Sequence, residues 1–289
     1  MRWNLKIINA PTHQAIDVFN LCINSMQDGD RKTNLNNIAA NFNSSFVDYT
    51  AKVALKEWYQ VPVFNGDNSD TVFGAVTKQN LKQLYDDQFV KNKEPRRIYD
   101  ELLASAPLGI CPFCGVTEAR SLDHYLPKAK YPILSVVPNN LIPSCSDCNK
   151  GKTDSFPVSK GQQCLHPYFD HALLVGVQWL FAEVNQTSPP SVLFHVSVPD
   201  GFSEDDAARI NTHFSDFELA VKFSNQAANE IAFLRELLQY DYDADGQDAV
   251  RTTLTRNASV AERLSVNSWK TAMYQALSQS DWYCDGGFR

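Results

Sequence analysis

The stretches CPFCG, residues 111–115, and CSDCNKGK, residues 145–152, decide how the centre of this chain folds. Each contains two cysteines separated by two residues, and thirty residues separate the two pairs. Two such pairs place four soft thiolates on tight turns, which suits a tetrahedral zinc ion. A redox pair needs only one C-x-x-C, and a chance cluster of buried thiols is the other alternative. We expect the cysteines of both pairs to hold one structural zinc ion: Cys111, Cys114, Cys145 and Cys148.

The composition is that of an ordinary globular protein. Of its 289 residues, 44% are hydrophobic, which is ample for a buried core. No window approaches eighteen uninterrupted apolar residues, and the opening MRWNLKIINAP is too polar for a signal peptide and predicts a short strand. We therefore expect a cytoplasmic protein that does not contact a membrane.

Charge is distributed unevenly along the chain. The net charge of −7 argues against indiscriminate binding of nucleic acid. Between Arg120 and Lys160, however, there are six basic side chains and three acidic ones, whereas residues 200–289 carry eight basic and fifteen acidic side chains. The centre of the chain can therefore meet phosphate, and the acidic C-terminal part suits a protein-binding surface.

Hydrophobic periodicity divides the chain into three parts and predicts the α+β class. Residues 1–105 predict a mostly helical lobe, interrupted by the loop FNGDNSD at 64–70, with helices at 16–26, 35–53, 77–90 and 96–105. Residues 106–160 lose this periodicity and are rich in Pro, Gly, Asn, Ser and Cys, as a module held by a metal would be. Residues 161–289 predict an α+β region with strands at 175–184 and 191–198 and helices at 203–214, 227–240 and 265–279.

A second pattern lies inside and just after the cysteine frame. Asp123 and His124 are adjacent, Asn140 precedes Leu141, and Asn149 directly follows the last cysteine. This order resembles the HNH endonucleases, the ββα-metal superfamily. They place D-H on a first strand, N-L on or before a second, and His or Asn at the start of a helix. The resemblance covers residues 111–155 and implies a zinc-stapled, treble-clef-like HNH module.

The resemblance implies a metal-dependent endonuclease that hydrolyses phosphodiester bonds, with DNA as the favoured substrate. Asp123 and Asn149 would hold one catalytic Mg²⁺ or Mn²⁺ through oxygen. His124 would accept a proton from the attacking water, and Asn140 would brace the loop that aims this histidine. Because Asp123 and His124 are neighbours on a strand, we expect their side chains to diverge.

Four lysines are candidates for contacts with nucleic acid: Lys128, Lys130, Lys150 and Lys152. The first two lie in the loop between the expected strands. The other two follow Asn149 on the first turn of a helix, where the N-terminus already favours anions.

Two further motifs have simpler interpretations. In LHPYFDH, residues 165–171, His166 either supports the active site or, as we favour, belongs to a buried turn that docks the module on the C-terminal region. DYDADG, residues 241–246, matches the first half of an EF-hand loop, but Thr252 stands where the loop needs a glutamate. We expect an acidic turn between helices there.

The layout around the module is similar to that of stand-alone bacterial HNH proteins of anti-phage systems, the Septu-type and retron-associated nucleases. This resemblance implies a defence effector that acts beside a partner ATPase or another subunit. The alternatives are a non-catalytic zinc module that binds nucleic acid or protein, and a restriction-type nuclease that recognises modified DNA through a pocket in residues 156–289.

Overall fold

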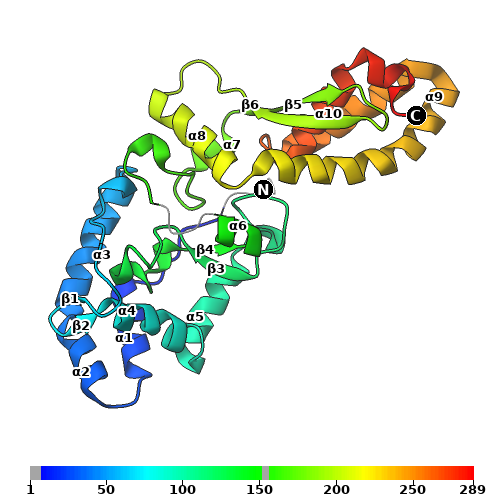
Figure 1. Ribbon diagram of the computed structural model, residues 1–289. Coiled ribbons are helices and arrows are strands. Elements are labelled where there is room, and N and C mark those ends of the chain that lie inside the picture. Colours follow the sequence, from blue (N-terminus) through cyan, green and yellow to red (C-terminus); the bar gives the residue numbers. More distant parts are fainter. Residues whose placement is uncertain (1–7, 152–155) are drawn as a thin grey trace.

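The computed structural model describes residues 8–151 and 156–289, and its class is α+β, as the sequence predicts (Figure 1). Within those residues the strands form three separate two-stranded antiparallel sheets. The N-terminal helices and the central hairpin lie in one body, and the C-terminal helices and hairpin form a second (Figure 1). The strand expected at the N-terminus lies largely outside the described residues.

The N-terminal lobe is helical around two short strands. Its elements are α1 (Ala15–Asn24), α2 (Asp30–Asn37), α3 (Ala39–Ala54), β1 (Thr71–Phe73), β2 (Val76–Thr77), α4 (Lys78–Gln83) and α5 (Lys93–Ala104). The single helix predicted over 35–53 is wrong, because non-helical Ile38 separates α2 from α3. Asparagine-rich sequence precedes this break, and asparagine side chains compete for backbone hydrogen bonds.

Helix α4 begins at a capping box. The Thr77 hydroxyl accepts a hydrogen bond from the Asn80 amide, and the Asn80 side chain accepts one from the Thr77 amide. After Gln83 the predicted helix continues as a π-helical segment, Leu84–Phe89. This segment delivers Tyr85 to the central module.

The central hairpin joins β3 (Ser121–His124) to β4 (Leu141–Ser144), and α6 (Ser146–Gly151) follows at once. In its register Asp123 pairs with Ile142 and His124 with Leu141. Helix α5 packs against both strands, and its Tyr99 hydroxyl accepts a hydrogen bond from the Leu122 amide at 3.3 Å. The N-terminal lobe thus supports the back of the hairpin.

The C-terminal region contains α7 (His171–Val175), β5 (Leu180–Asn185), β6 (Ser191–Val196), α8 (Glu204–Asp216), α9 (Leu219–Leu264) and α10 (Trp269–Gln279). The strand predicted over 175–184 begins only at Leu180, because α7 extends to Val175. Helix α9 is broken at Asp245 and at Gly246, whose φ of +61° and ψ of −150° suit only glycine. The DYDADG motif therefore contains a turn between two helical halves, as expected.

The LHPYFDH segment joins the three parts as a buried turn. His166 is fully buried, and its ring stacks on that of Trp58 with centroids 5.3 Å apart. Asp170 accepts a hydrogen bond from the His166 amide at 2.8 Å and forms a fully buried ion pair with Arg209 of α8. The Tyr125 hydroxyl donates to the Cys164 carbonyl at 2.6 Å. The favoured interpretation of this motif, docking, agrees with these contacts.

No helix among the described residues is both long and apolar enough to cross a membrane.

Candidate active site and metal centre

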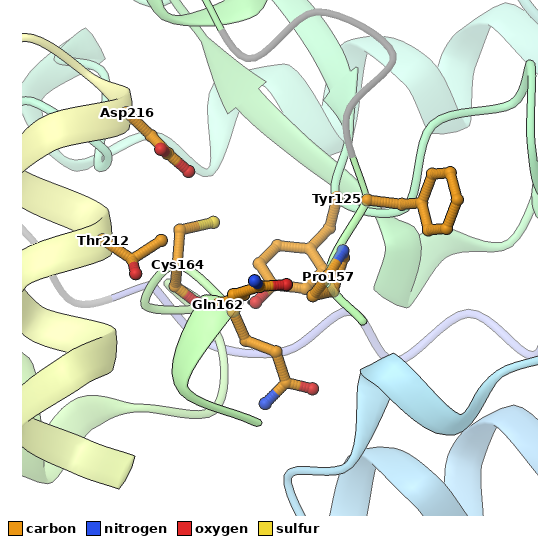
Figure 2. Close-up of a pocket in the computed structure, with 8 residues that line it drawn as sticks. Tyr125, Pro157, Gln162, Cys164, Thr212 and Asp216 are labelled. Carbon is orange, nitrogen blue, oxygen red and sulfur yellow. Dashed lines mark hydrogen bonds between the residues drawn. The ribbon is translucent and has the colours of Figure 1, made fainter. Parts of the chain in front are cut away.

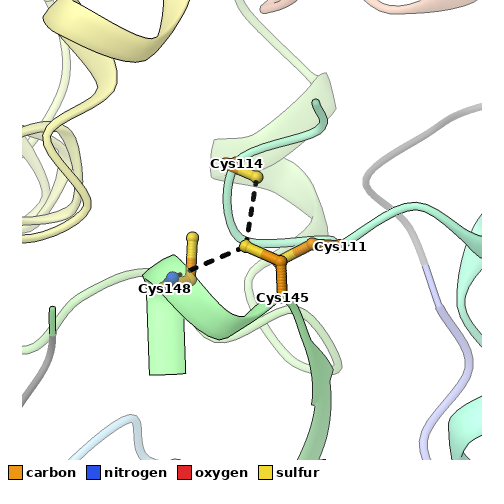
Figure 3. A group of neighbouring side chains, drawn as sticks. All are labelled: Cys111, Cys114, Cys145 and Cys148. Carbon is orange, nitrogen blue, oxygen red and sulfur yellow. Dashed lines mark hydrogen bonds between the residues drawn. The ribbon is translucent and has the colours of Figure 1, made fainter. Parts of the chain in front are cut away.

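The four cysteines of the two C-x-x-C pairs meet in one buried cluster (Figure 3). Their sulfur atoms all lie within 4.8 Å of one another, and the Sγ atoms of Cys114 and Cys145 are 4.0 Å apart. Ligands about 2.3 Å from a zinc ion at tetrahedral angles lie about 3.8 Å from each other. The cluster can therefore bind a metal ion such as zinc after a small contraction.

The local backbone explains how the first pair folds into a turn. The Gly115 amide donates to the Cys111 carbonyl at 2.8 Å, and Gly115 has a φ of +68°, which favours glycine. The second pair is split between the end of β4 and the first turn of α6, and the Cys148 amide lies 3.5 Å from the Cys145 sulfur. A strand end and a helix start thus aim both thiols at the first turn.

Contacts among the four sulfurs change their acidity in opposite directions. Hydrogen bonding, chiefly to Cys111, lowers the pKa of the Cys145 thiol to about 7 and holds that of Cys114 well below its usual range. The pKa values of Cys111 and Cys148 are raised instead, since each donates to neighbouring sulfurs. Thiolate character is therefore available at neutral pH for binding a soft cation.

The C-terminal region completes the surroundings of this cluster. The ammonium of Lys222 in α9 lies 3.6 Å from the Cys148 sulfur, where it adds a positive charge beside the cluster. His213 Nε2 lies 2.9 Å from the Phe113 carbonyl, and the Phe113 ring stacks on Phe217 with centroids 4.6 Å apart. No sequence motif marks these residues, because the contacts join elements about a hundred positions apart.

Three of the four predicted catalytic residues line one cleft of about 530 Å³, and the fourth, Asn140, does not. Asp123 and His124 from the end of β3 and Asn149 from α6 line it together. The expected divergence of Asp123 and His124 does not separate them, because His124 ends the strand and the cleft is wide enough to include both. They are 8% and 7% exposed, so both have only a narrow opening to solvent.

The imidazole of His124 is held on two sides. Its Nε2 lies 2.9 Å from the Ser135 carbonyl oxygen, and its ring meets that of Tyr85 edge-on with centroids 4.5 Å apart. A carbonyl can only accept, so Nε2 carries the hydrogen and Nδ1 holds the lone pair of the neutral ring. This tautomer leaves Nδ1 as the atom that can take a proton.

Asn140 is fully buried, and its side chain bridges two parts of the segment that connects β3 to β4. Its side-chain oxygen accepts from the Leu126 amide at 2.8 Å, and its nitrogen donates to the Leu126 carbonyl at 3.0 Å. A longer contact of 3.4 Å reaches the Leu134 carbonyl, one residue before Ser135. The amide therefore ties the chain leaving His124 to the chain that orients its ring.

A relative of this chain is known in a phage. The protein named ea31 of Escherichia phage lambda is 33% identical over 223 residues, which cover 73% of this chain and 75% of the phage protein. The chain belongs to the Ea31 family. The phage protein's name states no activity. No protein-family model matches the sequence, and no solved structure matches the chain.

In this Ea31-family chain, Asn149 of α6 is oriented by a residue of β3. Its side-chain nitrogen donates to the Ser121 hydroxyl at 3.2 Å, which leaves the amide oxygen as the group able to ligate a cation. The Asp123 carboxylate lines the same cleft, and carboxylate and amide oxygens are ligand types that Mg²⁺ and Mn²⁺ prefer. The expectation that the helix begins at Asn149 is wrong, because Ser146 starts α6 within the cysteine turn. Lys150 is therefore not at a helix N-terminus.

Of the four lysines predicted to contact nucleic acid, the structure places two at the cleft. Lys128 and Lys150 line the cleft, and Lys128 forms an ion pair with Asp86. Lys130 lines a different pocket, and Lys152 lies outside the described residues. Lys82 of α4 also lines the cleft, although no sequence signal placed it there. The Ea31-family cleft thus contains three lysines around its carboxylate.

A separate cavity of about 270 Å³ lies at the seam between the module and α8 (Figure 2). Thr212 and Asp216 of α8 reach it from one side and Tyr125 and Pro157 from the other, with Cys164 and Gln162 between them (Figure 2). The Thr212 hydroxyl donates to the Gly161 carbonyl at 2.9 Å, and the Gln162 side-chain oxygen accepts from the Val158 amide at 3.1 Å. The first bond joins α8 to the segment that contains Gly161, and the second lies within that segment.

Proposed function

We propose that this protein is a metal-dependent endonuclease that hydrolyses phosphodiester bonds of nucleic acid at the cleft. The observation that supports the proposal most is the meeting of Asp123, His124 and Asn149, from two elements, in one cleft with three lysines. Each residue type is common by itself, but together they provide oxygen ligands, a proton acceptor and cationic side chains.

The cleft residues would share the work as follows. Asp123 and Asn149 would hold one Mg²⁺ or Mn²⁺, which when bound supplies Lewis-acid stabilisation of the negative charge on the phosphate. His124 Nδ1 would accept the proton of the attacking water. The Ser135 carbonyl, which receives the Nε2 hydrogen, would keep the ring in place and stabilise its positive charge once protonated.

The lysines and the asparagine brace would position rather than react. Lys82, Lys128 and Lys150 would bind the phosphates on either side of the scissile bond. Asn140 would fix His124 relative to Ser135 through its backbone bridge. The cysteine cluster, loaded with zinc, would hold α6 and hence Asn149 beside β3. A closed four-sulfur site has no open position for substrate, so its role would be structural.

DNA stays the favoured substrate on the strength of the HNH resemblance. The anti-phage role beside a partner ATPase rests on the order of segments in the sequence. A relative encoded by phage lambda gives that role no support. We therefore propose the chemistry without tying it to a defence system.

The test is cleavage of supercoiled plasmid, linear duplex, single-stranded DNA and transfer RNA with Mg²⁺ or Mn²⁺. Wild type should cut at least one substrate, and His124→Ala should not. The matched control is His195→Ala, because His195 is exposed on β6, away from the cleft. Equal cleavage by His124→Ala and His195→Ala would rule out the proposed base. Binding without cleavage by a zinc-loaded wild type would favour the non-catalytic module.

A further inference from the structure

A further pocket, of about 250 Å³ and distinct from the cavity beside α8, lies next to the cleft. The chain segment 127–130 separates it from the cleft. Its walls are mostly apolar and come from α3, β1 and the segments 61–64 and 130–134. The ring-bearing wall residues Phe64 and Phe73 are half-buried. A pocket of this size admits one planar ring system rather than a helix or strand.

The backbone between the two cavities makes them neighbours. Pro127, Lys128 and Ala129 line the cleft, and the next residue, Lys130, lines the pocket. The amides of Lys130 and Tyr131 both donate to the Pro127 carbonyl at 2.9 Å, which folds this segment into a tight turn. A nucleic-acid strand with a phosphate in the cleft could therefore reach the pocket by crossing this turn.

Basic side chains continue from the cleft to the pocket. Lys82 and Lys78 are one turn apart on α4; Lys82 lines the cleft, and the Lys78 ammonium lies 5.9 Å from the centroid of the Phe64 ring. Lys130 lines the pocket itself. These three cations suit a polyanion that follows the same path, and the carboxylate that also lines the pocket, Asp48, is already ion-paired within α3.

One residue of the pocket wall carries a polar atom that has no partner within the described part of the chain. The hydroxyl of Tyr131, a residue only 1% exposed, has no hydrogen-bond partner among residues 8–151 and 156–289. Burial raises the pKa of Tyr131 to about 12, so the hydroxyl stays protonated at neutral pH. A buried hydroxyl without a partner is unfavourable, and the edge of a base carries acceptors that would satisfy it.

We infer that this pocket receives one unstacked nucleobase of the substrate, next to the scissile phosphate. The inference rests on the proposed nuclease function and adds to it a preference for substrates whose base can leave the stack, such as single strands or weakened duplexes. Phe64 and Phe73 would contact the face of the base, and the Tyr131 hydroxyl its edge.

The test measures binding, so that it does not depend on cleavage. The His124→Ala protein is titrated against a fluorescein-labelled single-stranded oligonucleotide, and against the same strand with one abasic site moved along it position by position. One position should weaken binding about five- to a hundredfold, as loss of base–aromatic stacking does. Phe64→Ala should weaken binding of the intact strand equally and abolish the difference between the intact strand and that abasic strand.

Two further variants guard against loss of folding. Ile133→Trp, which fills the pocket, should repeat the effect of Phe64→Ala, and Leu193→Ala, an exposed apolar residue on β6, should change nothing. If no abasic position matters, or if Phe64→Ala binds like Leu193→Ala, the inference is overturned; a pocket for a partner's side chain would give this result. If the abasic effect depends on Phe64 but wild type cuts no substrate, the pocket stands and the nuclease proposal fails.

Discussion

Removal of Arg209 should destabilise the protein by breaking the buried contact between α8 and the LHPYFDH segment. Arg209 and Asp170 are both fully buried. Nη1 of Arg209 donates to Oδ1 of Asp170 at 3.0 Å, and Nη2 donates to Oδ2. In Arg209→Met the carboxylate keeps the His166 amide at 2.8 Å and Lys56 at 3.3 Å, but loses two charge-assisted hydrogen bonds.

The expected cost follows from that loss. Each hydrogen bond to a charged group contributes about 1.5–3 kcal/mol, and breaking one side of a buried pair costs about 3–5 kcal/mol. We therefore expect Arg209→Met to lower the free energy of unfolding by about 3–5 kcal/mol. The measurement is urea denaturation monitored by tryptophan fluorescence. Arg251→Met is the matched control, because Asp281 in its ion pair is 93% exposed; with the further loss of a hydrogen bond to the Ser278 carbonyl, it should cost no more than about 1 kcal/mol. A loss below about 1 kcal/mol in Arg209→Met would refute the reasoning.

Three other predictions concern the metal cluster, the brace and the kink. Bound zinc should be lost as the pH falls from about 7 to 5, since protons compete for thiolates such as Cys145; retention of zinc on dialysis at the lower pH would contradict this. Asn140→Ala should lower the free energy of unfolding in urea by about 2–4 kcal/mol, because it leaves the buried amide and carbonyl of Leu126 without partners. Cleavage should fall as well. An unchanged unfolding curve would be inconsistent with the bridge. Gly246→Ala should lower the free energy of thermal unfolding by about 1–3 kcal/mol, because the backbone angles of Gly246 disfavour a residue with a Cβ. Gly201→Ala, in an exposed loop, is the control for the effect of a positive φ alone.

Local patterns predicted much of this structure. Helical periodicity located α1 and α5, and the C-x-x-C pairs located the cysteine cluster, because a zinc site is built from residues close in sequence within each half. The break at Ile38 and the late start of β5 were not predicted, since hydrophobic spacing does not record where a helix stops.

Some residues of the candidate site could be predicted from the sequence, and others could not. Asp123, His124 and Asn149 could be listed from order and spacing, whereas Lys82 and Tyr85 enter the site only through the packing of α4 and its π-helical extension on the hairpin. Lys130 looked equivalent to Lys128 in sequence, but the tight turn at Pro127 sends it to the other side. Such placements depend on tertiary contacts that no motif encodes.

The central claim is that Asp123, His124 and Asn149 form one cation-dependent nuclease site, and substitution at Asn149 tests it most directly. Plasmid cleavage is measured for wild type, Asn149→Ala and Asn149→His, each checked for retained zinc, across Mg²⁺, Mn²⁺ and Ni²⁺. We predict cleavage by wild type with Mg²⁺ or Mn²⁺, none by Asn149→Ala, and cleavage by Asn149→His with preference moved toward Ni²⁺, because imidazole is a softer ligand than an amide oxygen. Undiminished cleavage by zinc-loaded Asn149→Ala, or cleavage by wild type that needs no divalent cation, would contradict the claim.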